Sequence, residues 1–281
     1  MKPQVVWSIA GFDPSSGAGI TADLMTFAAH GLFGCSAITA LTVQSTRGVA
    51  GVQLISPRIL AETLDHLAED LPPAGVKIGM IGSGEAAAVI AAFLRRQNRP
   101  PLDRTSTMSV PVVFDPVLRS SSGRELYPAS AMAALNGELL PFVDWITPNW
   151  DELALLAEQP VSTVDEAANA ARVLIEKYPQ INVVATGGDQ PLPTDLLVLH
   201  SGERIEIEGE HVETTSTHGT GCAFSSALLA HLVQRISPEQ AVRGAKAYVT
   251  GALRRAPGLG HGRGPLGLLW PLTRRQNEFD L

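Results

Sequence analysis

The sequence predicts an α/β protein with a mostly parallel central sheet that helices cover on both faces. Up to residue 185, short apolar runs rich in β-branched residues alternate with segments of helical periodicity. Two short apolar runs then flank the turn 201–203, which predicts an antiparallel hairpin at the sheet edge. No stretch reads as a linker between domains, so we expect a single domain over residues 1–281.

The individual elements follow from the same periodicities, taken in chain order. Strands are predicted at Val5–Ala10, Cys35–Val43, Val76–Ile78, Val110–Phe114, Val143–Thr147, Ile181–Ala185, Asp195–His200 and Arg204–Glu208. Helices are predicted at Ile20–His30, Arg58–Glu69, Glu85–Gln97, Ala129–Leu140, Trp150–Glu158, Cys222–Gln234 and Glu239–Arg255. Because parallel strands are joined by right-handed crossovers, these helices should pack on both faces of the sheet.

The composition favours a small-molecule partner. Hydrophobic residues make up 45% of the 281 residues, which is enough for one large core. The net charge of −7 gives no general attraction for nucleic acid or for an anionic membrane. No apolar run approaches the roughly 18 residues that span a bilayer, and residues 1–10 do not resemble a secretion signal. We therefore expect a cytoplasmic protein in which Cys35 and Cys222 are reduced thiols.

The segment from His218 to Cys222 is the most informative in the chain. Gly219, Thr220 and Gly221 lead directly into a helical pattern, and the first amides of a helix have no partners within the helix. Together with the helix dipole, these amides stabilise a bound phosphate. A helix N-terminus also lowers the pKa of a cysteine, so Cys222 is a candidate base. This arrangement predicts phosphoryl transfer.

Two segments at the ends of early strands are candidates for the substrate pocket, because ligands collect there in open parallel sheets. The loop 11–19 contains three glycines and Asp13, but it matches neither a dinucleotide nor a Walker fingerprint. A plain strand-to-helix turn is the alternative interpretation. The amide of Gln44 donates and accepts in one plane, as the edge of a heterocycle requires, although an ordinary exposed glutamine is the commoner case.

Two acidic residues follow later strands and are candidate ligands for a metal ion. Asp115 ends one predicted strand, and Glu152 lies with Asn149 at the start of the helix after the next. Such a pair suits Mg²⁺, which takes one or two carboxylates and keeps most of its water. The alternative is purely structural, with Asn149 as a helix cap and Glu152 as a favourable N-terminal charge.

These segments together resemble the hydroxymethylpyrimidine/phosphomethylpyrimidine kinases of the ribokinase-like superfamily. The matching positions are Gly11–Asp23, Gln44, Lys77–Gly82, Asp115-Pro116-Val117, Thr147-Pro148-Asn149 with Glu152, and His218–Cys222. The resemblance covers nearly the whole chain and implies a three-layer ribokinase-like fold. It also implies ATP-dependent phosphorylation of 4-amino-5-hydroxymethyl-2-methylpyrimidine and then of its monophosphate, for thiamine biosynthesis, by a protein that pairs as a homodimer.

The resemblance also implies roles for particular residues. It makes Cys222 the base, with Gly219, Thr220 and Gly221 stabilising the transferring group. It assigns the pyrimidine pocket to Gly11, Asp23, Gln44 and Met80. It assigns nucleotide contacts to Asn149, Thr186, Gly188 and His218, and Mg²⁺ to Asp115 and Glu152.

One departure from the family pattern leaves other functions open. The family usually has a lysine where this chain has Thr186, so a cation near the ATP phosphates is replaced by a hydroxyl. Arg119 and Lys246 are candidates to substitute for it. A pyridoxal kinase of the same branch is the nearest alternative, and a ligand-binding protein that lost phosphoryl transfer is another.

Overall fold

The computed structural model describes residues 2–97, 110–119, 123–187 and 193–272, which form a three-layer α/β structure. Its sheet has nine strands in the order β3-β2-β1-β4-β5-β6-β7-β8-β9. Their bounds are β1 Val5–Phe12, β2 Phe33–Ser45, β3 Gly48–Leu54, β4 Gly75–Ile78, β5 Val112–Phe114, β6 Trp145–Ile146, β7 Asn182–Ala185, β8 Asp195–Val198 and β9 Arg204–Ile207. The strands from β2 to β7 in this order pair in parallel, while β3, β8 and β9 pair antiparallel at the two edges.

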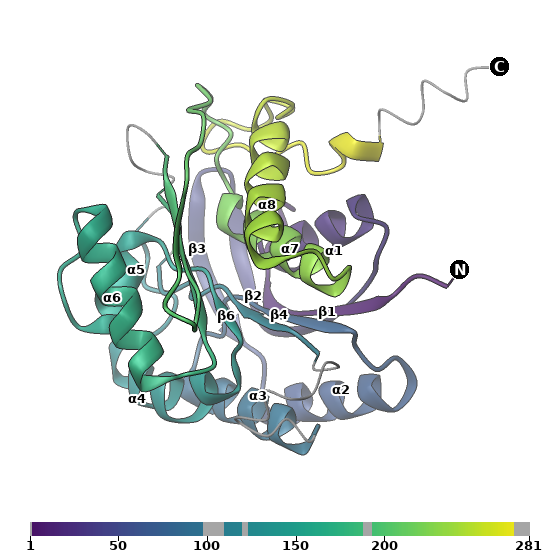
Figure 1. Ribbon diagram of the computed structural model, residues 1–281. Coiled ribbons are helices and arrows are strands. Elements are labelled where there is room, and N and C mark those ends of the chain that lie inside the picture. Colours follow the sequence, from purple (N-terminus) through teal and green to yellow (C-terminus); the bar gives the residue numbers. More distant parts are fainter. Residues whose placement is uncertain (1, 98–109, 120–122, 188–192, 273–281) are drawn as a thin grey trace.

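Helices cover both faces of the sheet (Figure 1). The longer ones are α1 Gly19–Ala29, α2 Pro57–Asp70, α3 Gly84–Arg96, α5 Trp150–Ala157, α6 Val164–Lys177, α7 Thr220–Val233 and α8 Pro238–Leu253. The helices α2, α3, α5 and α6 pack around one apolar core, and α1, α7 and α8 around a second core on the opposite face. The predicted α/β fold class with a mostly parallel sheet and an antiparallel edge hairpin is confirmed.

The helix α7 is buried along almost its whole length, because it lies between the sheet and α8. Ten of its residues are buried, including both serines of the Ser225-Ser226 pair. A helix that is apolar on all sides is buried in the interior, where side-chain packing on every side stabilises it. Its N-terminus is therefore fixed against the sheet, at the point where β1, β4 and β5 end.

Two elements are additional to those predicted. The strand β3 was missed because Gly48 and Gly51 interrupt its apolar pattern, and only its antiparallel pairing with β2 makes it a strand. The helix α6 was missed although Thr163 and Glu166 form a capping box, with Thr163 Oγ1 accepting from the Glu166 amide at 3.2 Å. That Thr-x-x-Glu spacing is the signal that identifies this helix in the sequence.

One predicted helix is wrong as a regular α-helix. The stretch 129–142 consists of two 3₁₀ turns, a three-residue α-helix and a π-helical turn, Leu135–Leu139. Pro141 and Gly137 explain the irregularity, because proline lacks an amide donor and glycine weakens a helix interior. The buried residues Leu135, Leu139 and Leu140 still give the segment an apolar side that packs on the first core.

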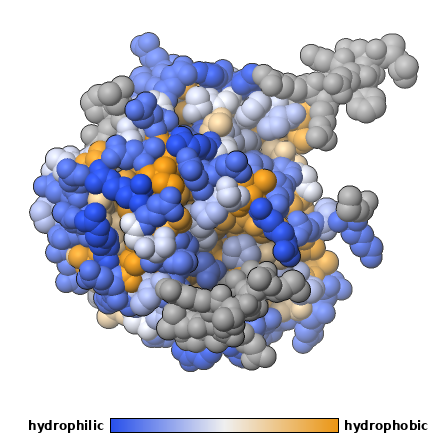
Figure 2. Space-filling view, in the orientation of Figure 1, coloured by the Kyte–Doolittle hydropathy of each residue, from blue (hydrophilic) through white to orange (hydrophobic). Residues whose placement is uncertain are grey.

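Hydrophilic residues dominate the face shown in Figure 2, with hydrophobic residues visible between them. This pattern is expected of helices that turn an apolar stripe inward and a polar face outward. Within the residues described, each helix is too short or too polar to cross a membrane.

Candidate active site

The candidate site lies where the carboxyl ends of the parallel strands meet the first turn of α7. The loop 13–18 follows β1, Met80 follows β4 and Asp115 follows β5. The start of α7 packs over these strand ends, since Gly221 approaches the Asp115 carboxylate. The predicted residues are therefore brought together by the topology, although they span more than 200 positions in the sequence.

A fully buried ionic cluster forms the floor of the site. Lys77 Nζ lies 2.9 Å from Asp23 Oδ2 and 3.9 Å from Asp115 Oδ2, and the Lys77 and Asp23 side chains have no exposed surface. Ser8 and Ser226 donate to the Asp23 carboxylate at 2.5 and 2.8 Å. The two carboxylates outweigh the desolvation of the ammonium, so the pKa of Lys77 lies above its usual value and the group is charged.

Asp23 was assigned to the pyrimidine pocket, and the structure shows its side chain fully buried. Its carboxylate is enclosed by Lys77 and the two serines and has no exposed surface. Because its oxygens are occupied by buried partners, Asp23 would influence a ligand through its charge and through Lys77. The sequence signal missed here was Lys77, a lysine inside an apolar run, which almost never occurs without a buried acidic partner.

Cys222 lies beside this cluster in the first turn of α7. The helix begins after Gly219, whose φ of 88° and close approach to the Gly17 carbonyl exclude any side chain at that position. Burial raises the pKa of the Cys222 thiol to about 12, although Lys77 and the Gly19 amide act to lower it. The expectation that the helix N-terminus lowers this pKa is wrong for the ligand-free protein, because desolvation outweighs the dipole.

The other end of the site carries a hydrogen-bonded chain of three polar side chains. His218 Nε2 lies 2.7 Å from Asp13 Oδ2 and 2.9 Å from Gln44 Nε2, so the loop after β1, the end of β2 and the segment before α7 meet at one imidazole. Gly17 lies against the ring and leaves no room for a β-carbon. His218, assigned to the nucleotide, thus lies beside Gln44, and the Asp13 link was not predicted.

Gly11 and Met80 are in contact, as expected for two walls of one pocket. A β-carbon on Gly11 would lie 2.9 Å from Met80 Sδ, so glycine is needed here for the thioether to pack against the backbone. Thr39 donates a 2.6 Å hydrogen bond to the Met80 carbonyl and so holds in place the segment that follows β4. An adaptable apolar side chain at this position suits the face of a flat ring.

Asn149 and Glu152 cap helix α5, and Glu152 is also one of two neighbouring acids that suit a metal ion. Asn149 and Glu152 form a capping box, with each side chain accepting from the other's backbone amide at 2.9 Å. Burial and the nearby Asp115 charge raise the pKa of Glu152 to about 8. Burial also raises the pKa of Asp115. Two acids that disfavour each other's charge are a fitting environment for a cation, and two carboxylates are the number that Mg²⁺ takes.

Thr147 was not assigned an individual role in the site, yet it has a feature expected of a ligand contact. Its buried hydroxyl has no hydrogen-bond partner among the described residues, which is uncommon for a buried polar atom. It directly follows β6 and precedes Asn149 by two residues. Among the described residues, no group of three or more histidine, cysteine or acidic side chains could hold a metal ion without other ligands.

Thr186 lies next to Asn149, and its amide donates to the Pro148 carbonyl at 2.8 Å. Gly188 falls outside the described residues. Lys246, a candidate substitute for the missing lysine, pairs with Asp195 at 2.8 Å and donates to the Pro193 carbonyl. Asp195 in turn accepts a hydrogen bond from the Gly187 amide, so Lys246 helps to hold the backbone next to Thr186 through Asp195. The backbone of Arg119, the other candidate, forms an isolated antiparallel β-bridge with that of Glu125.

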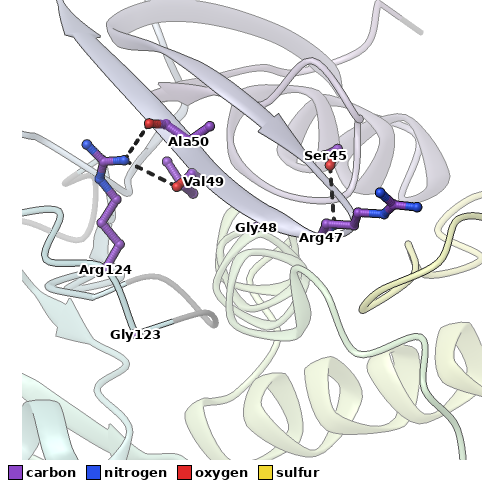
Figure 3. Close-up of a pocket in the computed structure, with 7 residues that line it drawn as sticks. All are labelled: Ser45, Arg47, Gly48, Val49, Ala50, Gly123 and Arg124. Atoms are coloured by element: carbon purple, nitrogen blue, oxygen red, sulfur yellow. Dashed lines mark hydrogen bonds between the residues drawn. The ribbon is translucent and has the colours of Figure 1, made fainter.

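A surface hollow of about 630 Å³ adjoins the strand that carries Gln44 (Figure 3). Arg124 donates to the Val49 and Ala50 carbonyls there, at 3.2 and 2.7 Å, which joins the loop after β5 to strand β3. The hollow is lined by Ser45, Arg47, Gly48, Val49, Ala50, Gly123 and Arg124. None of these residues belongs to the buried cluster, so the hollow is a feature of the β2–β3 edge.

Comparison with known proteins identifies the family. The phosphomethylpyrimidine kinase family model matches residues 13–267. This chain belongs to that family. It is 35% identical to a hydroxymethylpyrimidine/phosphomethylpyrimidine kinase from Synechococcus elongatus, over 97% of this chain and 100% of the relative.

Two solved structures show the same fold. A pyridoxal kinase from Staphylococcus aureus in complex with ADP superposes with a TM-score of 0.83 at 26% identity, covering 96% of this chain and 94% of the other. A phosphomethylpyrimidine kinase from Clostridium difficile 630 gives a TM-score of 0.73 at 33% identity, covering 88% and 98%. The predicted family and the ribokinase-like fold are confirmed.

Proposed function

We propose that the protein transfers phosphate from ATP to 4-amino-5-hydroxymethyl-2-methylpyrimidine and then to its monophosphate, for thiamine biosynthesis. The observation that carries this proposal is the meeting of Cys222, in the first turn of α7, with the buried Asp23–Lys77–Asp115 cluster inside a phosphomethylpyrimidine kinase family member. The curated relative from Synechococcus elongatus bears both activities in its name. Gly11 packs against Met80, and the family resemblance assigns both residues, with Gln44, to the ring.

Catalysis in this proposal is mainly electrostatic. Phosphoryl transfer is accelerated by positioning and by fixed charge, and little covalent chemistry is left to the protein. The amides of Thr220, Gly221 and Cys222 precede the first internal bond of α7, in which the Ala223 amide donates to Gly219. These amides would face the transferring group, and Lys77 adds a permanent positive charge below them. Because burial raises the pKa of the Cys222 thiol to about 12, the thiol would first release its proton to solvent when substrate and ATP bind, and the resulting thiolate, beside the Lys77 charge, would accept the proton of the substrate hydroxyl as that oxygen attacks.

We further propose that Asp115 and Glu152 hold Mg²⁺ together with the ATP phosphates. The ion would supply charge neutralisation between the phosphates. The raised pKa values of both acids and the unpartnered Thr147 hydroxyl support a ligand at this end of the site. Asn149 and Thr186 border the same region, and Gly188 is retained as a predicted nucleotide contact from the sequence alone.

A pyridoxal kinase is the second candidate, because the pyridoxal kinase from Staphylococcus aureus superposes with the TM-score of 0.83. A ring-binding protein without transfer is the third. Incubating the purified protein with ATP, Mg²⁺ and each ring compound separates the three. Pyrimidine monophosphate and diphosphate support the proposal, pyridoxal phosphate alone favours the second candidate, and tight binding without ADP release favours the third.

The effect of Thr186 is tested by the second transfer step. If phosphorylation stops at the monophosphate, Thr186→Lys should restore the second step or lower the KM for ATP. A Thr186→Ser variant keeps the hydroxyl and serves as the matched control. If Thr186→Lys changes neither quantity, position 186 is not the cause of the defect.

We also propose that two copies pair through the β2–β3 edge and that the enzyme works in the cytoplasm. Phe33, Leu41, Val43 and Leu54 on these strands are exposed, with Val43 at 67%. Leu41 and Val43 lie on the same face of β2, and exposed apolar side chains at a sheet edge are typical of an interface. Light scattering should give the dimer mass for the native chain and the monomer mass for Val43→Lys. Cys35 and Cys222 are both free thiols, in keeping with a reducing compartment.

A further inference from the structure

We propose that Asp13, acting through His218, determines whether the oxygen or the nitrogen of the Gln44 amide faces His218. This in turn sets the register, that is the orientation, of the ring in the pocket. The identity of the ring rests on the proposed function. The hydrogen bonds among Asp13, His218 and Gln44 do not depend on the identity of the ring, so the two can fail separately. Asp13 and His218 are thereby positioning residues for substrate selection.

The Asp13 carboxylate accepts hydrogen bonds from its own loop. The Ser15 amide and hydroxyl donate to Oδ1 at 2.8 and 2.7 Å, and the Ala18 amide donates to Oδ2 at 3.0 Å. Burial would raise the pKa of Asp13, but hydrogen bonds from His218 and Ser15 bring it below its usual value. An ionised carboxylate has no hydrogen to donate. His218 Nε2, at 2.7 Å from Oδ2, must therefore carry the hydrogen of that contact.

That hydrogen decides what Gln44 presents to His218. The Gln44 Nε2 position lies 2.9 Å from His218 Nε2, and the Oε1 position lies 3.1 Å from Thr42 Oγ1. The Thr42 hydroxyl already donates to the Phe12 carbonyl at 2.9 Å. Two nitrogens that both carry hydrogen do not bond, and a hydroxyl whose hydrogen is in use only accepts. Turning the amide by 180° removes both conflicts, because Oε1 then shares the one Nε2 hydrogen of His218 with Asp13 in a three-centre hydrogen bond, and Nε2 of Gln44 donates to Thr42.

The direction of the amide fixes the direction of the ring. An amide recognises an amine next to a ring nitrogen with two bonds, in which its oxygen accepts from the amine and its nitrogen donates to the ring. In the proposed substrate, the amine lies between ring nitrogen 3 and the carbon bearing the hydroxymethyl group. With Oε1 at the His218 end, the hydroxymethyl group lies on the side of His218. His218 adjoins Gly219 and the start of α7, so this register turns the reacting hydroxyl toward Cys222. With the Gln44 amide in the opposite orientation, the hydroxyl would point away from Cys222.

The tautomer of His218 is a direct test on the ligand-free full chain. We expect ¹⁵N NMR of the imidazole nitrogens to show hydrogen on Nε2 of His218. Hydrogen on Nδ1 alone would overturn the inference, because Nε2 would then accept from Gln44 as well as face Asp13. This measurement needs no variant and no substrate.

The register is tested with a pair of substrates. The 4-amino pyrimidine and its 4-oxo analogue present opposite donor and acceptor patterns on the same edge. Asp13→Asn should reduce the preference for the amino compound in kcat/KM by about tenfold or more, the size of effect seen when one bidentate pair is lost. Ser15→Ala removes a different bond to the same carboxylate and should change the preference by less than about twofold, as for a merely local loss.

An unchanged preference in Asp13→Asn, or an equal loss in both variants, would overturn the register. The split between parameters gives a further readout, because a misplaced hydroxymethyl group lowers kcat for the amino compound more than it changes the KM for ATP. If the native chain phosphorylates neither ring, the proposed function fails. The His218 tautomer then still decides whether Asp13 orients Gln44.

Discussion

The two ends of the site use opposite physical means. The phosphate end holds Lys77, Asp23 and Asp115, which are charged groups removed from water and paired with one another. The ring end holds Gln44 and His218, which are half-buried and joined by directional hydrogen bonds to Asp13. Charge in a low-dielectric interior acts strongly on a migrating phosphate, whereas direction and shape distinguish one flat ring from another. Changes at the first end should therefore affect rate and stability, and changes at the second should affect substrate choice.

The largest expected effect is on turnover. Cys222→Ala should lower kcat by about 10²- to 10⁴-fold, the usual contribution of a general base. Nucleotide binding should remain, because the thiol is buried and the backbone amides of α7 are unchanged. Steady-state kinetics and calorimetric titration with ADP measure the two quantities. Retention of more than a tenth of the native kcat would show that the thiol is not the base.

The next effect is on folding stability. Lys77→Met should lower the free energy of unfolding by about 3–5 kcal/mol, because Asp23 is left as an unpaired buried charge. Urea denaturation followed by circular dichroism measures it. The double variant Lys77→Met with Asp23→Leu is the control and should recover part of the loss. A single variant as stable as the native chain would mean that the buried pair contributes nothing.

A smaller effect is expected at the ring end. Gly17→Ala would place a β-carbon 2.2 Å from His218 Cδ2, so the imidazole must shift and Gln44 with it. We expect the KM for the ring compound to rise by about tenfold, in line with about 1–3 kcal/mol for overpacking, while the KM for ATP is unchanged. Gly137→Ala is the matched control, since a β-carbon there has no atom within 4 Å. Equal rises in both KM values would contradict the separation of the two ends.

The smallest effect concerns the far end of α7, away from both parts of the site. Burial lowers the pKa of His30 and of His231, whose rings lie 5.2 Å apart. Since the fold favours the neutral forms, their stabilising contribution is present above about pH 6.5 and is lost as the pH falls below that value. The thermal midpoint should fall between pH 7.5 and 5.5, and less so in His231→Gln. An equal fall in both proteins would assign the acid sensitivity to other groups.

Local patterns alone predicted most of the fold. The alternation of apolar runs and helical segments gave the parallel sheet and its edge hairpin, because side-chain periodicity follows directly from backbone geometry. It failed at β3, where glycines hide the pattern, and at 129–142, where Pro141 and Gly137 break the helix that the spacing suggests. The capping signal of α6 was present in the sequence, so that helix was predictable.

The sequence by itself also determined the family and the residue types of the site, because glycine loops, strand-end acids and the cysteine before α7 are local features. Only the tertiary structure decided which of them touch. Burial raised the pKa of Cys222, where the sequence predicted a lowered one. The fold also enclosed Asp23 beside Lys77 and brought Asp13, 205 positions away in sequence, into hydrogen-bond contact with His218. Desolvation and hydrogen-bond partnership depend on neighbours brought by the chain from elsewhere, so no local pattern carries them.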